Sequence, residues 1–253
     1  MRPTEEMSGF ADALRAVQGV EGWLTDAQAK RLWDRAHELR PQARIVEIGS
    51  FRGRSTIILA RAAPAGAEVV AIDPHLGTDR GPRQWITSEE LGERDRRAFL
   101  ANLERSGVAG HVRHVRRLSQ EAHGQVGRDI DLLFVDGAHR YQPAHDDLVR
   151  WGAKVRSGGT LLVHDAFSSV GLTAALLRQM VFADDWSWHG RTGSLAEYRR
   201  RAALSPAERL WGALRQLAQL PWFARNLLVK AALVARLRPV ARLLGHRSGP
   251  WPY

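Results

Sequence analysis

The chain has 253 residues and no cysteine, and its 37 lysine and arginine residues against 27 aspartate and glutamate residues give a formal net charge of +10. This length accommodates one large α/β domain, and the lack of cysteine excludes a disulfide framework and a thiolate metal site, leaving oxygen and imidazole ligands that suit Mg²⁺ or Mn²⁺. We find no apolar N-terminal signal and no uncharged apolar run of about 20 residues that would cross a bilayer, so we expect a cytoplasmic protein.

Helices are predicted for the first forty residues. Thr25 and Gln28 have the spacing of a capping box, in which each side chain satisfies a free backbone N–H group at the start of the helix. Apolar residues at helical spacing follow, and Pro41 ends the helix.

The segment from Ile45 to Ser55 joins an apolar strand to a turn bracketed by Gly49 and Gly53, and then to an apolar helix. Glycine lets the backbone approach a ligand closely, and α/β sheets bind ligands where a helix begins at the carboxyl end of a strand. The spacing E-x-G-x-x-x-G-x-S differs from the G-x-G-x-x-G of dinucleotide-binding proteins. It therefore indicates an amino-acid-bearing nucleoside, S-adenosylmethionine, in place of a pyrophosphate cofactor.

Three further apolar strands end in acidic residues. The first ends at Asp73, the second at Asp136 and the third at His164 and Asp165. Because the ligand site of such a sheet lies at the carboxyl ends of its strands, we expect these acids in one site, with His139 on the loop after Asp136. A carboxylate at the position of Asp73 is placed to accept hydrogen bonds from both ribose hydroxyls. Alternatively, this strand-terminal acid, which a proline follows, caps a turn.

The remaining segments of this domain complete an alternating α/β order. Residues 74–85 form a turn-rich connection with two arginines at the ligand end of the sheet, which makes this loop a candidate lid. The other predicted elements are a charged helix over 89–106, a strand over 111–116, a helix over 171–181, and two closing antiparallel strands over 185–189 and 193–198.

The C-terminal segment, residues 204–253, contains eight basic residues and one acidic residue. Ser205 caps a first helix that Pro221 interrupts, and residues 222–237 form a second helix with an apolar face and basic residues elsewhere. Such a helix binds a membrane surface, or it docks on its own domain or on a second subunit. No recognition motif for a specific nucleic acid accompanies the charge.

The segment Ile45–Phe167 resembles the class I S-adenosylmethionine-dependent methyltransferases. Within them, residues 134–141 (FVDGAHRY) and 158–165 (GGTLLVHD) are similar to the metal-dependent O-methyltransferases. The similarity is to the actinobacterial branch that methylates sugar hydroxyls, such as the macrocin and mycinamicin O-methyltransferases and the mycobacterial methylmannose-polysaccharide 1-O-methyltransferase.

The resemblance implies a Rossmann-like, doubly wound, seven-stranded mixed sheet with an added C-terminal helical segment. We therefore expect residues 1–40 to form an N-terminal helical or lid segment, 41–203 the cofactor-binding catalytic domain, and 204–253 a basic amphipathic tail. Trp23 then either belongs to a lid over the cofactor or packs its helix against the sheet.

The resemblance also implies roles for individual residues. Asp136 and Asp165 are expected to hold Mg²⁺ or Mn²⁺. Members of the family often have a third metal ligand beside the last aspartate, and here we expect His164 or water to take that position. Ser119 contacts adenine in this scheme, or else only caps its helix. The residues expected to bind S-adenosylmethionine are Glu47, Gly49, Ser50, Gly53, Ser55, Asp73, Ser119 and Asp136.

His139 is the candidate general base, because imidazole titrates near neutrality and members of the resembled family use the histidine of this Asp-Gly-Ala-His motif. Alternatively, it only positions the metal or the loop. The expected reaction is an in-line displacement, in which the metal and His139 generate an alkoxide that attacks the sulfonium methyl group.

Two other functions stay open at this point. One is a metal-independent small-molecule methyltransferase, and the other is a non-catalytic membrane- or partner-binding module that keeps the cofactor pocket. The acceptor hydroxyl is not identified by the sequence, since substrate pockets in this fold come from loops. A homodimer is the default expectation.

Overall fold

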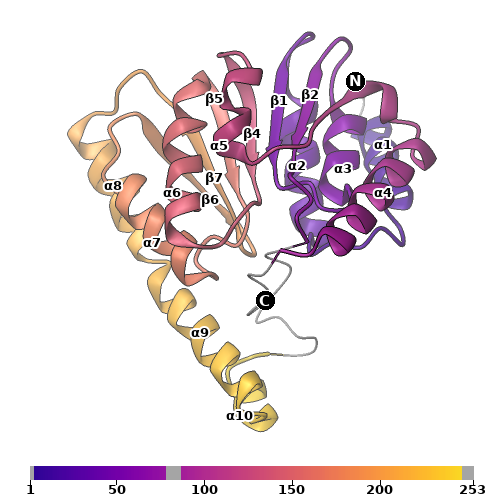
Figure 1. Cartoon of the computed structure of the whole chain (residues 1–253). Helices are drawn as coiled ribbons and strands as arrows, with labels where there is room; N and C mark the ends of the chain where they lie inside the picture. Colours follow the sequence, from indigo (N-terminus) through magenta and orange to yellow (C-terminus); the bar gives the residue numbers. More distant parts are fainter. Residues whose placement is uncertain (1–2, 78–86, 247–253) are drawn as a thin grey trace.

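The computed structural model describes residues 3–77 and 87–246. A seven-stranded mixed sheet crosses the molecule in the order β3-β2-β1-β4-β5-β7-β6 (Figure 1). β7 pairs antiparallel with β5 and β6, and the other pairs are parallel. The strands are β1 (Arg44–Ile48), β2 (Glu68–Ile72), β3 (Val112–Val115), β4 (Ile130–Val135), β5 (Val155–Val163), β6 (Trp186–Thr192) and β7 (Leu195–Arg200).

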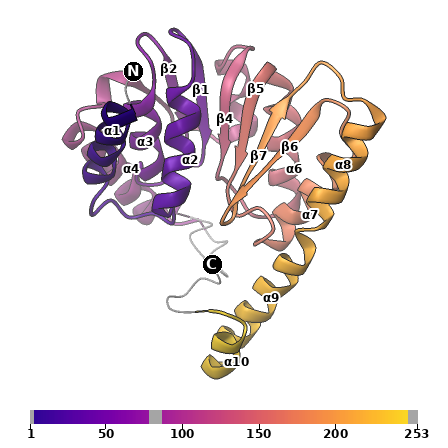
Figure 2. The same ribbon diagram turned by 180° about the vertical axis from the view of Figure 1, so that it is seen from behind.

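Helices cover both faces of this sheet (Figures 1 and 2). The α-helices are α1 (Pro3–Ala16), α2 (Asp26–His37), α3 (Arg54–Ala62), α4 (Glu89–Arg105), α5 (Ser119–Ala122), α6 (Tyr141–Arg150), α7 (Val170–Gln179), α8 (Pro206–Leu217), α9 (Leu220–Val234) and α10 (Arg238–Leu243). Short 3-10 helices lie at Ala109–His111, His123–Gln125 and Gly152–Lys154.

The central strands are buried on both sides because alternate side chains enter two separate cores. Ile45 and Phe134 join residues of α1 to α4 in one core, whereas Val46 and Val135 join residues of α6 and α7 in the other. This arrangement confirms the doubly wound fold that the sequence predicted. The strand order reverses between β1 and β4, the position at which open α/β sheets bind ligands.

The capping and proline signals in the sequence can be compared with the observed helix ends. The Thr25 side chain accepts a hydrogen bond from the Gln28 backbone and the Gln28 side chain bonds back, which is the predicted capping box. α2 ends at His37, before Pro41. Pro221 lies in the first turn of α9, where a missing N–H group costs no hydrogen bond, so this helix begins at Leu220 and ends at Val234, in place of the predicted 222–237.

The segment after β7 divides into two parts. α8 packs against the body, where Ala213 and Gln216 are buried. α9 and α10 extend away from the body in both views, with Ala241 of α10 buried against Val229 and Ala232 of α9 (Figures 1 and 2). We call α9 and α10 together the C-terminal arm. Among the described residues, no helix has the length and apolarity needed to cross a membrane.

Candidate active site

A cavity of about 1240 Å³ opens at the carboxyl ends of β1, β2, β4 and β5. The turn after β1, the ends of β2, β4 and β5, and the helix α9 all contribute to its wall. The predicted site residues that line it are Gly49, Ser50, Ser55, Asp73, Ser119, Asp136, His139, His164 and Asp165. The structure therefore brings the acidic strand ends into one site, whereas Glu47 and Gly53 lie outside the cavity wall.

The glycine turn after β1 packs directly against the end of β4. Gly49 has a φ of 87°, and a Cβ atom added there would lie 2.2 Å from the backbone oxygen of Asp136. Asp73 braces the same turn, since one carboxylate oxygen accepts hydrogen bonds from the backbone N–H groups of Ser50 (2.9 Å) and Phe51 (2.8 Å). The other oxygen accepts one from the His75 backbone (2.7 Å). This carboxylate is thus held at the cavity wall and stabilises the turn, and its predicted contact with ribose stays a prediction.

Glu47 is fully buried in β1, behind the turn. The hydroxyl groups of Ser55 and Thr56, at the start of α3, both donate hydrogen bonds to its carboxyl group. Burial outweighs these bonds and raises the pKa of Glu47 to about 8, with smaller contributions from Asp136 and Asp73. Its contacts link β1 to α3, and its predicted direct contact with the cofactor stays a prediction.

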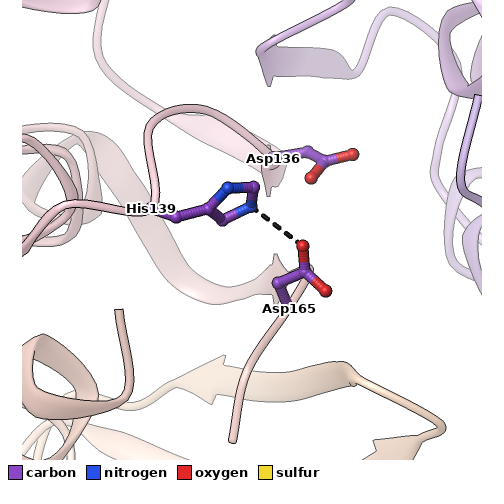
Figure 3. Close-up of side chains that lie close together, drawn as sticks. All are labelled: Asp136, His139 and Asp165. Atoms are coloured by element: carbon purple, nitrogen blue, oxygen red, sulfur yellow. Dashed lines mark ion pairs between the residues drawn. The ribbon is translucent and has the colours of Figure 1, made fainter. Parts of the chain in front are cut away.

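Asp136, His139 and Asp165 converge inside the cavity. Each offers a ligand atom, and these atoms lie within 4.8 Å of one another. His139 Nε2 forms an ion pair with Asp165 Oδ2 at 2.9 Å, and Figure 3 shows the Asp165 carboxylate turned toward the imidazole, with Asp136 beside the pair. Burial lowers the pKa of His139, but the contact with Asp165 and the charge of Asp136 outweigh it and raise that pKa. Two carboxylates beside an imidazole are a donor set that a hard divalent cation accepts.

His164 has a different position from the one predicted for a metal ligand. It lies outside the group of three, and its Nδ1 contacts Asp136 Oδ1 at 3.0 Å while its Nε2 faces Gln28 Oε1 at 3.4 Å. Burial disfavours its charge, yet the charges of Asp136 and Asp165 raise its pKa to about 9. The group that could hold a metal ion therefore contains Asp136, Asp165 and His139, whereas His164 contacts Asp136 from outside it. The role of His164 as a metal ligand stays a prediction.

Ser119 meets a residue that the sequence had not suggested for the site. Its hydroxyl group donates a hydrogen bond to Asp147 Oδ1, and both residues line the cavity. Burial raises the pKa of Asp147 to about 6 against the effect of this bond. Asp147 lies on α6, and no part in the site was predicted for it from the sequence. The paired side chains place polar groups beside the site predicted for adenine.

Other parts of the wall come from segments distant in sequence. Trp23 stacks on Phe51, with ring centroids 5.1 Å apart, and both line the cavity. Lys230 and Val234 of α9 line it as well, which the sequence did not indicate. The Lys230 ammonium donates a hydrogen bond to the Ser168 backbone oxygen at 2.7 Å. Most of the predicted lid, including both its arginines, lies outside the described residues.

Comparisons with known proteins agree with this architecture. Residues 46–166 match the model of a family described as a methyltransferase domain. Cofactor-bound Rv0187 from MTB is similar in structure, with a TM-score of 0.55 and 22% identity over 77% of this chain and 90% of that one.

Two solved O-methyltransferases give similar values. TomG from Streptomyces achromogenes, involved in tomaymycin synthesis and solved with SAM, has a TM-score of 0.54 and 20% identity over 77% of this chain and 90% of its own. An O-methyltransferase from Bacillus cereus in complex with SAH has a TM-score of 0.50 and 17% identity, over 76% of this chain and 88% of its own. The chain thus shares the class I methyltransferase fold of these structures, and its residues 46–166 match a methyltransferase domain.

Proposed function

We propose that this protein is an S-adenosylmethionine-dependent O-methyltransferase that acts on a hydroxyl group with the help of a divalent cation. The observation that carries the proposal is the convergence of Asp136, His139 and Asp165 in a cavity that also contains the glycine turn and Asp73. In this scheme Asp73 accepts the ribose hydroxyls and Ser119 with Asp147 faces the adenine. When bound, the sulfonium cofactor supplies an electrophilic methyl group.

Asp136 and Asp165 would hold Mg²⁺ or Mn²⁺, which acidifies a coordinated hydroxyl group. His164 donates to Asp136 and so fixes the direction of that carboxylate. In its neutral form His139 would take the proton of the acceptor hydroxyl, because its imidazole lies beside the two carboxylates that would hold the cation. Positioning and electrostatics then supply most of the rate.

The finer proposal concerns the acceptor. The resemblance of residues 134–141 and 158–165 to sugar O-methyltransferases supports a sugar, either in a glycosylated natural product or in a polysaccharide. A metal-independent small-molecule methyltransferase is the second candidate. It is favoured by the ion pair between His139 and Asp165, which gives His139 a charged partner within the protein itself.

Calorimetry and turnover test both candidates. We expect S-adenosylhomocysteine to bind the wild type, and we expect transfer to a panel of sugar and phenol acceptors to stop with EDTA and return with Mg²⁺. Turnover that persists in EDTA would favour the metal-independent enzyme. Cofactor binding without transfer to any acceptor would favour a non-catalytic module, and no cofactor binding would contradict the proposal itself.

Substitution of the metal ligands gives a second readout that does not need the acceptor. Asp165→Asn removes one of two carboxylates, so Mn²⁺ binding followed by electron paramagnetic resonance should weaken by at least about tenfold. Glu121→Gln on α5 is the control, because this acid is exposed and outside the cavity wall. Equal Mn²⁺ binding by both variants would place the cation elsewhere.

A further inference from the structure

The chain from Arg209 to His246 carries basic side chains with no acidic residue among them. In α9 and α10, Arg225 is held by the Leu244 backbone oxygen and Lys230 by Ser168. Arg236, Arg238 and Arg242 are exposed, and no described residue pairs with their side chains. The outer end of the C-terminal arm therefore presents a positive charge that the described protein does not balance.

Large apolar side chains are exposed on the same arm. Leu243 is 87% exposed and Val234 is 75% exposed, and Leu237 and Val240 are also exposed. Val240 and Leu243 lie three residues apart on one side of α10, and Leu237 directly precedes this helix. Arg238 and Arg242, four residues apart, occupy another side. A helix that separates exposed leucines from arginines in this way has the pattern of an interfacial membrane helix.

The arm reaches the cavity at the end of α9, and exposed apolar side chains contribute to the cavity wall beside the exposed Glu21 and Arg140. Exposed apolar side chains that also line the cavity are Trp23, Leu76, Leu118, Tyr141, Val170 and Val234. Val234 belongs to both features, since it lies at the end of α9 and on the cavity wall. An apolar rim and a basic apolar arm therefore form one continuous surface.

We propose that this surface, made of the C-terminal arm and the rim of the cavity, binds an anionic lipid bilayer and turns the cavity mouth toward it. Negative headgroups balance Arg236, Arg238 and Arg242, while the exposed leucines enter the acyl boundary. A second copy of this chain would instead bring two unbalanced positive arms together, and like charges across an interface are unfavourable. The charge thus selects the bilayer over a symmetric dimer through the arm.

Vesicle co-sedimentation tests the proposal with the full chain. We expect binding to vesicles of phosphatidylglycerol and phosphatidylcholine in equal parts, much weaker binding to phosphatidylcholine alone, and release at 1 M NaCl, where the Debye length is about 3 Å. The double variant Arg238→Glu/Arg242→Glu should lower the partition coefficient at least about 25-fold, from about fivefold for each basic residue removed.

Apolar contacts are tested separately. Leu237→Glu/Leu243→Glu should lower the partition coefficient at least about tenfold, since two buried leucines are lost. Val170→Glu, on the rim but outside the arm, should weaken binding as well, and wild-type binding by this variant would remove the rim from the proposal. The matched controls are Arg61→Glu/Arg94→Glu for charge and Leu100→Glu for apolar contact, all at exposed positions on α3 and α4.

Calorimetry with S-adenosylhomocysteine shows whether the two arm variants stay folded, because neither alters the cavity wall. This readout also separates the proposal from the proposed function, since the membrane result stands whether or not methyl transfer is found. Equal binding to both vesicle types, or equal binding by arm variants and controls, would overturn the proposal. The proposal would also be overturned if the wild type did not bind vesicles and formed a dimer in sedimentation velocity that dissociates in Leu237→Glu/Leu243→Glu.

Discussion

At the scale of single residues, Glu47 couples stability to pH. Its pKa is about 8 in the folded protein, against 4.5 for an unperturbed glutamate. Between these values the folded chain holds a proton that the unfolded chain lacks, so the free energy of unfolding falls as the pH rises from about 4.5 to 8. In Glu47→Gln this loss is absent, and the difference in unfolding free energy between the two proteins should shift by on the order of 2–4 kcal/mol between pH 5 and 9.

Urea unfolding of both proteins at a series of pH values measures this shift. The control is Glu121→Gln, whose carboxylate is exposed and whose difference from the wild type should not vary with pH. Parallel curves for the wild type and Glu47→Gln would mean that Glu47 is ionised in the folded protein.

Gly49 offers a second test at this scale, because a substitution there would add both backbone strain and a steric clash. Alanine would have to adopt a φ of 87°, and its Cβ would overlap the Asp136 backbone. Gly107 has a φ of 71° with no atom within 4 Å of its missing Cβ, so Gly107→Ala carries the backbone cost alone, about 1–2 kcal/mol. We expect Gly49→Ala to lose at least about 2 kcal/mol more in urea unfolding, and to lose S-adenosylhomocysteine binding. Equal losses would show that the turn and β4 separate easily.

At the scale of elements, α9 stabilises the loop that carries Asp165. Asp165 and Phe167 both have left-handed backbones, with φ of 55° and 56°, a conformation that costs non-glycine residues energy. From α9, Asn226 donates a hydrogen bond to the Phe167 oxygen at 3.3 Å, and Lys230 donates one to the Ser168 oxygen at 2.7 Å. A helix outside the segment that matches the methyltransferase family thus holds a predicted metal ligand in place.

Lys230→Met keeps an unbranched side chain, one atom shorter, but removes the donor to the Ser168 carbonyl. We expect unfolding free energy to fall by about 1–2 kcal/mol and the amides of residues 164–169 to exchange faster with deuterium. Lys30→Met is the control, since its partner Asp34 lies four residues away on α2, and its effect should stay within about 0.5 kcal/mol. Unchanged exchange in Lys230→Met would mean that the loop holds its conformation without α9.

The sequence predicted those elements whose signals are local. The site at Asp73, Asp136 and Asp165 could be predicted because each of these acids follows an apolar strand, and parallel strands bring their carboxyl ends to one edge of the sheet. Asp147 was not predicted, because an acid within a helix is equally typical of a solvated face, and only tertiary packing makes this one buried. Lys230 was not predicted either, since nothing in its local sequence separates it from the other basic residues of the tail.

The direction of α9 explains why the sequence did not place Lys230 at the cavity. Arg191 of β6 lies 3.7 Å from the ring centroid of Trp222 and donates a hydrogen bond to the Gln219 side chain at 2.7 Å. These contacts join the sheet edge to the start of α9, and that junction aims the helix at the cavity. Such a geometry arises between segments that are distant in the chain, so periodicity and capping signals do not contain it.

At the scale of the whole molecule, α8 packs on the body, whereas α9 and α10 form the C-terminal arm. Two truncations measure how much each part contributes to stability. Tyr198 is fully buried, and its hydroxyl group bonds Gln216 of α8 at 3.1 Å, while Gln216 bonds the Met180 backbone oxygen at 3.2 Å. Ending the chain at residue 203 removes these partners and uncovers the core, which should cost at least about 3 kcal/mol. Ending it at residue 235 removes only α10 and the residues beyond it, which should cost about 1 kcal/mol, because Ala241 buries little apolar area.

Urea unfolding of the two truncated chains measures these costs, and vesicle binding gives an independent readout for the same proteins. The chain ending at 235 should keep its stability but lose vesicle binding, because Arg238, Arg242 and Leu243 are gone. If both truncations lose several kcal/mol, α10 belongs to the folding unit and the arm is a structural element of the body. If neither does, α8 only lies on the surface, and the buried bond between Tyr198 and Gln216 contributes little because water replaces Gln216 as the partner of the tyrosine hydroxyl.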